Sequence, residues 1–198
     1  MVFEFQTFIA QLTGQDVANA SLYDGATSMT EAALMAQRVT KRRKIAIGND
    51  IHPHYREVLR SYMSNFDDVD IVEADPDDET ACLIVQSPDF YGQPHKYEAF
   101  RKKCDESGAL LVVVVNEIVS LGLLPAPETA DIVCGEAQSI GVAMSYGGPH
   151  LGFFACKQKY VRQMPGRLCG MSEDADGCLL YTSPSPRDQR GSRMPSSA

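Results

Sequence analysis

Several features that would assign a class immediately are missing from this sequence. No apolar run is long enough to span a bilayer, and residues 1–5 do not form the charged-then-apolar start of a secretory leader. The 18 Lys and Arg residues are outnumbered by 26 Asp and Glu residues, and the net charge is −8. A chain with this charge is repelled by nucleic-acid phosphates and by anionic lipids. We expect no nucleic-acid partner and no membrane association.

Short catalytic signatures are missing as well. The chain has no G-x-x-x-x-G-K-[ST] or G-x-G-x-x-G phosphate-binding loop, no H-E-x-x-H zinc motif and no Ser-His-Asp pattern. None of its six cysteines forms a C-x-x-C pair, and His52 and His54 lack an obvious third metal ligand. We therefore expect no metal site. Because most cysteines lie in apolar runs, we expect buried, reduced thiols and a cytoplasmic location.

Residues 1–177 contain apolar segments of two kinds, which alternate. Phe5, Ile9 and Leu12 share one face of a helix that Gly14 would end. Further helices are expected at 28–40, 53–66 and 94–107, and strands at 44–47, 69–72, 81–85, 109–115, 132–133 and 151–155. Residues 28–31 fit a capping box for the second helix. This alternation is typical of an α/β fold with a mostly parallel, doubly wound sheet.

The carboxyl ends of the strands are where open α/β sheets bind ligands. The loops expected there are residues 48–52, 86–92, 116–120, 136–141 and 145–150. They carry His52, which would make a polar contact at the strand ends, and His150, which could act as an acid or base or as an interface contact. Either histidine could equally be hydrogen-bonded without any such role.

Residues 20–27 form a small-residue turn in front of the second helix. Free N–H groups and the positive end of the helix dipole converge at such a turn, which suits a phosphate or a carboxylate. Tyr23, Asp24 and Thr27 belong to this turn. The same residues also fit a tight turn in which Asp24 caps the helix. The sequence leaves both interpretations open.

The composition of the chain changes at residue 178. The segment 178–198 is rich in Ser, Pro and Arg and has no helical or strand period, as in a disordered tail or linker. We prefer another interpretation: residues 178–188 resemble a translated adapter from a DNA sequencing library, and residues 192–198 resemble its far end. We therefore treat 178–198 as a disordered artefact and restrict the fold to residues 1–177.

Residues 1–177 resemble the P-protein of the glycine cleavage system (glycine decarboxylase), and within that family the alpha subunit of the two-subunit bacterial form. The matching segments, in order, are residues 3–7, 18–27, 52–56, 86–88, 120–122, 130–139, 147–153 and 161–167. Small departures are Asp89, where the family has Asn, and Ala137, where it has Gly. The family subunit is longer at both ends, so the resemblance implies an internal fragment of its large domain.

This resemblance implies the fold of pyridoxal-phosphate (PLP) dependent transferases of fold type I. It also implies an oxidoreductase: the whole enzyme decarboxylates glycine, passes the aminomethyl group to the lipoyl group of the H-protein and releases CO2. The implied partners are the beta subunit, the H-protein and glycine. The isolated fragment would be inactive.

No lysine occurs between Lys103 and Lys157. In the family fold the Schiff-base lysine falls in the turn after the strand at 132–133, where this chain has Gln138 and Ser139. Neither an amide nor a hydroxyl can replace the lysine amine. The strand at 109–115 also lacks an aspartate for the pyridinium nitrogen. The resemblance therefore implies that the beta subunit holds PLP, and that this chain has no catalytic or cofactor-binding residue of its own.

Six residues are candidates to face a shared active site, chosen from their positions in loops. They are Tyr23, Asp24, Thr27, His52, Ser139 and His150. Two other functions stay open. One is a stand-alone PLP enzyme of another type, against which the missing lysine argues. The other is a non-catalytic module that keeps the PLP fold and binds or regulates a partner.

Overall fold

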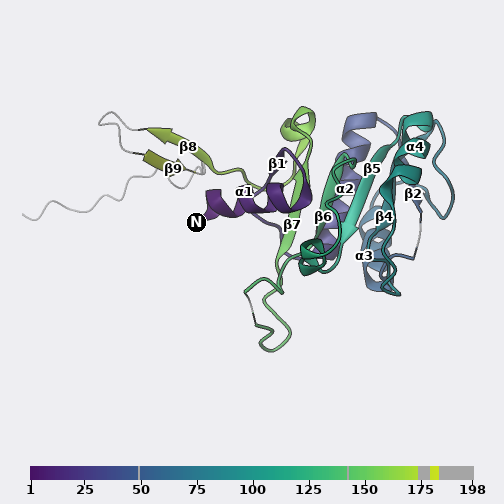
Figure 1. Ribbon diagram of the computed structural model, residues 1–198. Helices are drawn as coiled ribbons and strands as arrows, with labels where there is room; N and C mark the ends of the chain where they lie inside the picture. Colours follow the sequence, from purple (N-terminus) through teal and green to yellow (C-terminus); the bar gives the residue numbers. More distant parts are fainter. Residues whose placement is uncertain (49, 142, 174–178, 183–198) are drawn as a thin grey trace, which may run out of the picture.

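A seven-stranded sheet forms the centre of the computed structural model, which describes residues 1–48, 50–141, 143–173 and 179–182 (Figure 1). The strand order is β1-β7-β6-β5-β4-β2-β3. The strands are β1 (Val17–Ala18), β2 (Lys44–Ile47), β3 (Ile71–Val72), β4 (Thr80–Gln86), β5 (Leu110–Val115), β6 (Ile132–Glu136) and β7 (Gly152–Cys156). All neighbouring pairs from β3 to β6 are parallel, and β7 is antiparallel to both β6 and β1.

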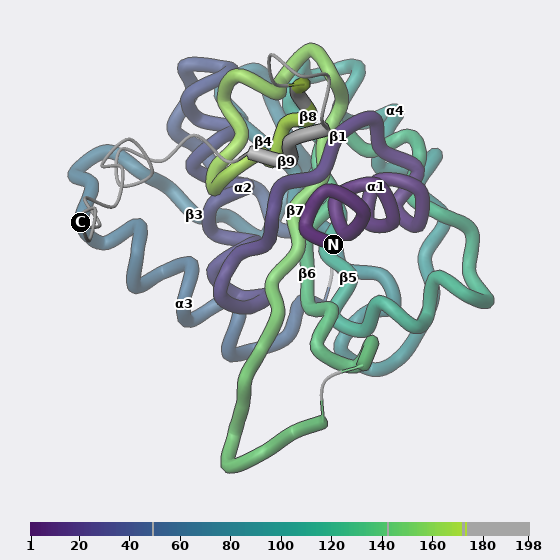
Figure 2. Tube along the Cα trace, turned by 90° about the vertical axis from the view of Figure 1, so that its left-hand side faces the viewer, coloured from purple at the N-terminus to yellow at the C-terminus, as the bar shows by residue number. Residues whose placement is uncertain are grey.

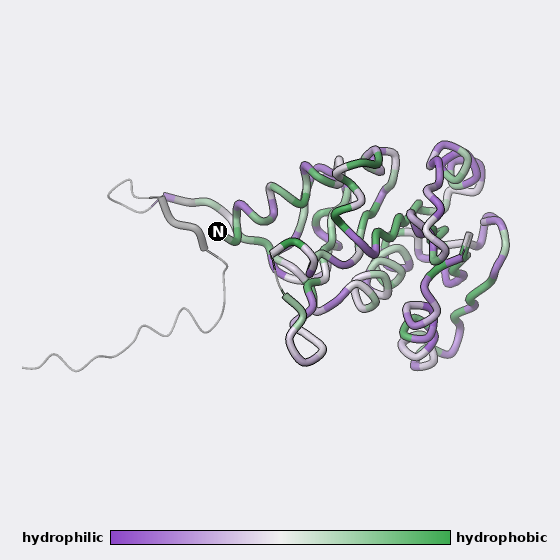
Figure 3. Tube along the Cα trace, turned by 60° about the horizontal axis from the view of Figure 1, so that its bottom comes forward, coloured by the Kyte–Doolittle hydropathy of each residue, from purple (hydrophilic) through white to green (hydrophobic). Residues whose placement is uncertain are grey.

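Two strands explain why the sheet needs a helical layer on each face. Every residue of β4 and of β5 is buried, and both strands are almost continuously apolar. A strand that is apolar on both faces must be covered on both. Figure 3 shows the hydrophobic colour concentrated along the interior of the molecule and the hydrophilic colour on many of the outer loops.

The helices form two layers. The helices are α1 (Val2–Thr13), α2 (Gly25–Thr40), α3 (Pro53–Met63) and α4 (Tyr97–Ser107), with two 3₁₀ helices, η1 (Ile118–Gly122) and η2 (Gln158–Gln163). One core cluster joins α2 and α3 to one face of the sheet, and a second joins α1 and α4 to the other. Figure 2 shows these pairs on opposite sides of the sheet. The predicted α/β class and the doubly wound, mostly parallel sheet are therefore confirmed.

The start of α2 differs from the expectation. The helix begins at Gly25, and its cap is Asp24, whose Oδ1 accepts from the Thr27 N–H at 2.7 Å while the Asp24 N–H donates to the Thr27 Oγ1 at 3.3 Å. The predicted capping box at Ser28 is wrong, because the Ser28 N–H already donates to the Asp24 carbonyl inside the helix at 3.0 Å. The observed cap therefore lies one turn before the predicted one, at Asp24.

Other boundaries shift by a few residues. The expected strand at 69–72 is only the two-residue β3, and α4 begins at Tyr97 rather than at residue 94. The strand β1 and both 3₁₀ helices were not expected, because segments this short carry no measurable hydrophobic period.

A second, two-stranded sheet follows the main one. It pairs β8 (Gly170–Glu173) with β9 (Leu179–Thr182) in antiparallel register. The expectation of no regular structure after residue 177 is wrong for Leu179–Thr182, which form β9. Three of these four residues are apolar or aromatic, and such residues favour strands. The rest of 178–198 lies outside the described residues, and the adapter interpretation stays a prediction.

Candidate functional site

Four elements direct polar residues to the carboxyl edge of the parallel strands. Gln86 and Glu136 end β4 and β6, and Asn116 and Glu117 directly follow β5. The N-terminus of α3 follows the exit loop of β2, and the N-terminus of α2 contacts the end of β6 through a hydrogen bond. This edge is the usual ligand-binding place in an open α/β sheet.

Glu136 is the centre of one polar cluster at this edge. Its Oε2 accepts from the Gly25 N–H at 3.1 Å, at the first residue of α2. Its Oε1 accepts from the Gln138 N–H at 3.0 Å and from the Leu151 N–H at 2.8 Å. The side chain is only 17% exposed. One carboxylate thus holds together the start of α2, the turn after β6 and the segment that enters β7.

Two glycines let α2 lie this close to the sheet. A Cβ on Gly25 would lie 2.0 Å from the Tyr55 Oη, and a Cβ on Gly152 would lie 2.4 Å from the Asp24 carbonyl oxygen. No side chain tolerates such distances without movement of its neighbours. Only glycine at these two positions permits the observed contacts between α2, α3 and β7.

Tyr55 covers the start of α2 from the side of α3. Burial raises the pKa of the Tyr55 hydroxyl above its ordinary value, and the nearby carboxylates of Glu136 and Asp24 raise it further. The hydroxyl therefore stays protonated at neutral pH. Tyr55 adds a neutral polar group, and no positive charge, to the cluster around Glu136.

A second polar cluster is centred on Gln86, which is fully enclosed at the end of β4. Its Oε1 accepts from the His52 N–H at 2.8 Å and from the Asn116 Nδ2 at 3.2 Å, and its Nε2 donates to the Pro88 carbonyl at 3.0 Å. Burial lowers the pKa of His52, and His54 lowers it further. His52 is therefore neutral at pH 7, with its ring 5.4 Å from the Tyr55 ring and 5.2 Å from the Phe90 ring.

The turn after β6 carries the residues that replace the expected lysine. The Gln138 N–H is bound to Glu136, and the Ser139 hydroxyl donates to Glu117 Oε1, which also accepts from the Val119 N–H at 3.1 Å. Both residues of this turn are therefore tied to carboxylates of the chain itself.

The structure brings only some of the candidate residues together. Asp24 and Thr27 form the α2 cap, and the His150 Nδ1 lies 3.8 Å from the Glu136 Oε2. Ser139 lies on the Glu117 side of the same edge, and His52 belongs to the Gln86 cluster. Tyr23 is 89% exposed.

Four residues of this edge are not among the six candidates: Tyr55, Gln86, Asn116 and Glu136. The last three lie in the loops expected at the strand ends, but the sequence did not single them out. A signal existed for two of them, because a polar residue that directly ends a fully apolar strand, as Gln86 and Glu136 do, is placed at the edge where ligands bind. The contacts of Tyr55 with Gly25 depend on packing between helices, which the sequence does not reveal.

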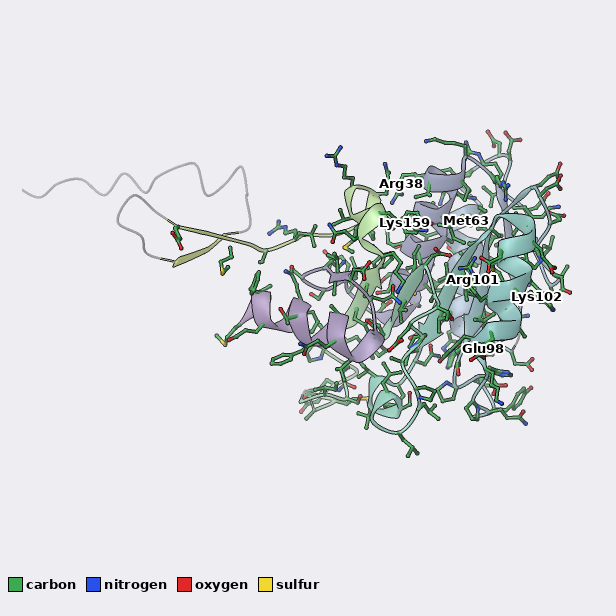
Figure 4. The ribbon with its side chains drawn as sticks, turned by 45° about the horizontal axis from the view of Figure 1, so that its top comes forward. Arg38, Met63, Glu98, Arg101, Lys102 and Lys159 are labelled. Atoms are coloured by element: carbon green, nitrogen blue, oxygen red, sulfur yellow. The ribbon has the colours of Figure 1, made fainter. Side chains whose placement is uncertain are left out.

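Among the cavities that the described residues line, one lies far from the Glu136 cluster and another lies beside it, because Leu151 lines the second. One, of about 780 Å³, is at the opposite edge of the sheet, and its lining residues include Arg101, Lys159 and Asp131. Figure 4 labels Arg101 and Lys159. The other, of about 470 Å³, lies between α1 and the segments around β7 and is lined by Phe8, Leu12, Ile140 and Leu151, among others.

Within the described residues, no group of three or more His, Cys, Asp or Glu side chains is arranged to hold a metal ion. None of the helices in this part of the chain has the length and apolar character needed to cross a membrane.

The fold is that of the PLP-dependent transferases of fold type I. Solved structures with the same fold include a cysteine desulfurase from Thermococcus onnurineus (15% identity, TM-score 0.60, covering 92% of this chain and 50% of the other). Another is a putative L-allo-threonine aldolase from Listeria monocytogenes (16% identity, TM-score 0.59, covering 82% and 50%). At these identities the likeness concerns the fold alone.

The family is defined by closer matches. The family model for the glycine cleavage system P-protein matches residues 1–184, and the chain belongs to this family. A crystal structure of a glycine decarboxylase (P-protein) in inhibitor-bound form superimposes with a TM-score of 0.86 at 38% identity, covering 92% of this chain and 44% of that one.

Curated relatives match at higher identity. Proteins named "Probable glycine dehydrogenase (decarboxylating) subunit 1" are 50% identical in Methylocella silvestris and 49% identical in Azorhizobium caulinodans, each over 190 residues. The matches cover 89% of this chain and 42% of each relative. The chain therefore spans less than half the length of these relatives.

The residues of this chain do not fit the PLP that the fold implies. A Schiff base needs a primary amine, and the turn after β6 offers only Gln138 and Ser139. The start of α2, where an anion would bind, already holds the Glu136 and Asp24 carboxylates. Charges of the same sign repel at short range, so a phosphate beside these carboxylates is disfavoured.

Proposed function

We propose that this chain is part of the cofactor-free subunit of a glycine decarboxylase. Its partner, the beta subunit, would carry PLP and the Schiff-base lysine. Together the two subunits would decarboxylate glycine, transfer the aminomethyl group to the lipoyl group of the H-protein and release CO2. The observation that carries the proposal is the combination of membership in the P-protein family with Gln138 and Ser139 in the turn after β6.

The contribution of this chain would be a rigid surface next to the partner's site. Glu136 and Gln86 each join three segments at the carboxyl edge through hydrogen bonds, so the loops between them are held in fixed positions. On this surface we place the six candidate residues, which would contact the partner or line the entrance to its site. They are Tyr23, Asp24, Thr27, His52, Ser139 and His150.

A cytoplasmic location is part of the same proposal. Burial raises the pKa of the Cys104 thiol to about 12 and raises the pKa of Cys82, Cys134 and Cys156 as well. Thiols with raised pKa values stay protonated and react slowly with oxidants or disulfides. They act as small apolar core residues, which suits a reducing compartment.

The alternative function is a regulatory module with the same fold and no role in glycine decarboxylation. Co-expression of the full-length subunit with a beta-type subunit from the same genome separates the two. The proposal expects a stable complex, glycine-dependent release of CO2 only when both subunits and H-protein are present, and borohydride-fixed PLP on the beta subunit alone. Absence of a complex together with absence of activity would contradict the proposal and favour the regulatory module.

The remaining rival, a stand-alone PLP enzyme, predicts a different result in the same experiment. Borohydride would then fix the cofactor to a lysine of this chain, and a peptide map would locate it. PLP fixed to this chain would contradict the proposal that the beta subunit holds the cofactor, even if the complex were active.

A further inference from the structure

We propose that Glu136 prevents phosphate-bearing cofactors from binding to this chain, because its carboxylate occupies the position at the N-terminus of α2 where a phosphate would bind. The inference deepens the proposed function and rests on it only in assigning PLP to the partner. The fold would otherwise present the α2 N-terminus to a phosphate, and the residue that meets the first N–H of the helix is Glu136.

The Glu136 carboxylate lies where a bound anion would lie. The Glu136 Oε2 accepts from the Gly25 N–H at 3.1 Å, at the first residue of α2. This N–H is one of the donors that no helical carbonyl can satisfy and that a bound anion would use. The Asp24 Oδ1 takes the Thr27 N–H at 2.7 Å. Two of the first three N–H groups of α2 are therefore bound to carboxylates of the chain.

Glu136 is also held in place from its other side. Its Oε1 accepts from two more backbone donors, Gln138 at 3.0 Å and Leu151 at 2.8 Å. A carboxylate fixed by three N–H groups cannot rotate away to admit a ligand without losing all of them. Each hydrogen bond to a charged acceptor is stronger than one between neutral groups.

The charges around the start of α2 also disfavour a bound phosphate. Asp24 and Glu136 both have carboxylate oxygens at this end of α2, and Tyr55, which covers Gly25 from α3, contributes no charge. Among the described residues, the ion-pair partner of Glu136 is His150, whose Nδ1 lies 3.8 Å from the Glu136 Oε2 and whose side chain is 48% exposed. A phosphate at this helix end would meet two carboxylates, and no lysine or arginine of the described residues pairs with either of them. Glu136 is therefore a specificity-determining residue that works by exclusion.

The test compares ligand binding by the full chain and by variants at two neighbouring carboxylates. Glu136→Ala removes the carboxylate from the α2 N-terminus. Glu117→Gln is the matched control, because Glu117 lies one strand away at the same edge and contacts Ser139 and Val119 rather than α2. The probes are inorganic phosphate, PLP, and pyridoxal, which has the same ring without the phosphate. Binding is measured by calorimetry and by the ligand-induced shift of the melting temperature.

The expected result is a gain that depends on the phosphate group. Glu136→Ala should bind inorganic phosphate and PLP about tenfold more tightly than the parent chain, while Glu117→Gln should match the parent. Pyridoxal should show no gain. Equal affinities of Glu136→Ala and the parent for phosphate would overturn the proposal. An equal gain in affinity for pyridoxal would overturn it too, because it would indicate a newly opened cavity rather than an anion site.

Two further measurements keep the proposal testable if Glu136→Ala does not fold. Glu136→Gln keeps an acceptor oxygen but removes the charge, and it should show a smaller gain of the same kind. In the parent chain the Gly25 amide resonance should not move when inorganic phosphate is added, and a saturable shift would overturn the proposal. No readout involves glycine or the partner, so failure here is distinct from failure of the proposed decarboxylase function.

Discussion

The Arg101 Nη1 donates to the Asp131 Oδ2 across 2.6 Å, at the edge of the sheet opposite the Glu136 cluster. The same Oδ2 accepts from the Leu111 N–H at 3.0 Å, and the Tyr160 hydroxyl donates to the Asp131 Oδ1 at 3.2 Å. Asp131 is almost completely buried. This carboxylate therefore connects α4, β5, β6 and η2 at the amino edge, much as Glu136 connects segments at the carboxyl edge.

Replacing Arg101 with Ala should destabilise the chain by about 2 kcal/mol, because Asp131 stays buried with its main cationic partner gone. The neighbour Lys102 on α4 is the control, since its pair with Glu106 is exposed and 3.9 Å long (Figure 4). Lys102→Ala should change stability by less than about 0.5 kcal/mol. Urea unfolding followed by circular dichroism measures both variants, and equal effects would refute the assigned role of Asp131.

The pair of Asp89 and His95 gives a prediction about pH. Burial pushes the pKa of Asp89 upward, but the His95 ring at 2.8 Å and the N–H groups of Gln93 and Tyr91 outweigh it and hold the pKa below its ordinary value. A carboxyl whose pKa is lowered by folding stabilises the fold above its unfolded pKa and loses that contribution as pH falls through the folded value.

Asp89→Asn should therefore lower the melting temperature at pH 7 and have a progressively smaller effect as the pH falls below about 4. The comparison of parent and variant at pH 7, 5 and 3 measures this dependence. A difference in melting temperature that stays constant over this range would show that the charge of Asp89 contributes nothing.

Much of the fold was predictable because its strongest signals are local. The runs at 81–85 and 109–115 are apolar on both faces, and β4 and β5 lie there with one or two residues of difference. Gly14 ends α1 in a left-handed conformation, φ 65°, as a glycine after an apolar helical face predicts. The helix α3 begins at Pro53, because the N–H that proline lacks would have no intrahelical partner in the first turn.

The polar clusters were not predictable, because their members are far apart in the sequence. Glu136 binds donors at residues 25, 138 and 151, and Gln86 joins residues 52 and 116. These contacts require β6 to lie beside β7. They also require α2 to pack between these strands and α3. The start of α2 was misplaced for a different reason: Asp24 and Ser28 both precede helical residues, and only the packed structure selects Asp24.

The close contact of Gly25 with Tyr55 predicts a strong effect of a single methyl group. Gly25→Ala would place a Cβ 2.0 Å from the Tyr55 Oη, so we expect destabilisation by about 1–3 kcal/mol. Tyr55→Phe in the same chain should recover part of the loss, because it removes the nearest atom. Gly122→Ala is the control: nothing lies within 4 Å of its Cβ position, and its stability should stay within about 0.5 kcal/mol of the parent.

The α2 cap can be tested by comparing two substitutions of Asp24, the residue that caps the helix. Asp24→Ala should lower stability by about 1 kcal/mol, because the Thr27 N–H loses its acceptor. Asp24→Asn keeps an oxygen at the same place and should retain most of the stability. If the Asn variant were as unstable as the Ala variant, the charge of Asp24 would matter more than its role as an acceptor.

The apolar cavity beside α1 predicts how the chain behaves in solution. Phe8 is 61% exposed and lines this cavity with Leu12, Ile140 and Leu151. Apolar surface of this kind, exposed in one place, promotes self-association. Phe8→Glu should therefore raise the soluble, monomeric fraction measured by size-exclusion chromatography. Tyr91→Glu is the control, because Tyr91 is 73% exposed but does not line the cavity. An equal gain from both variants would attribute the effect to added charge rather than to this surface.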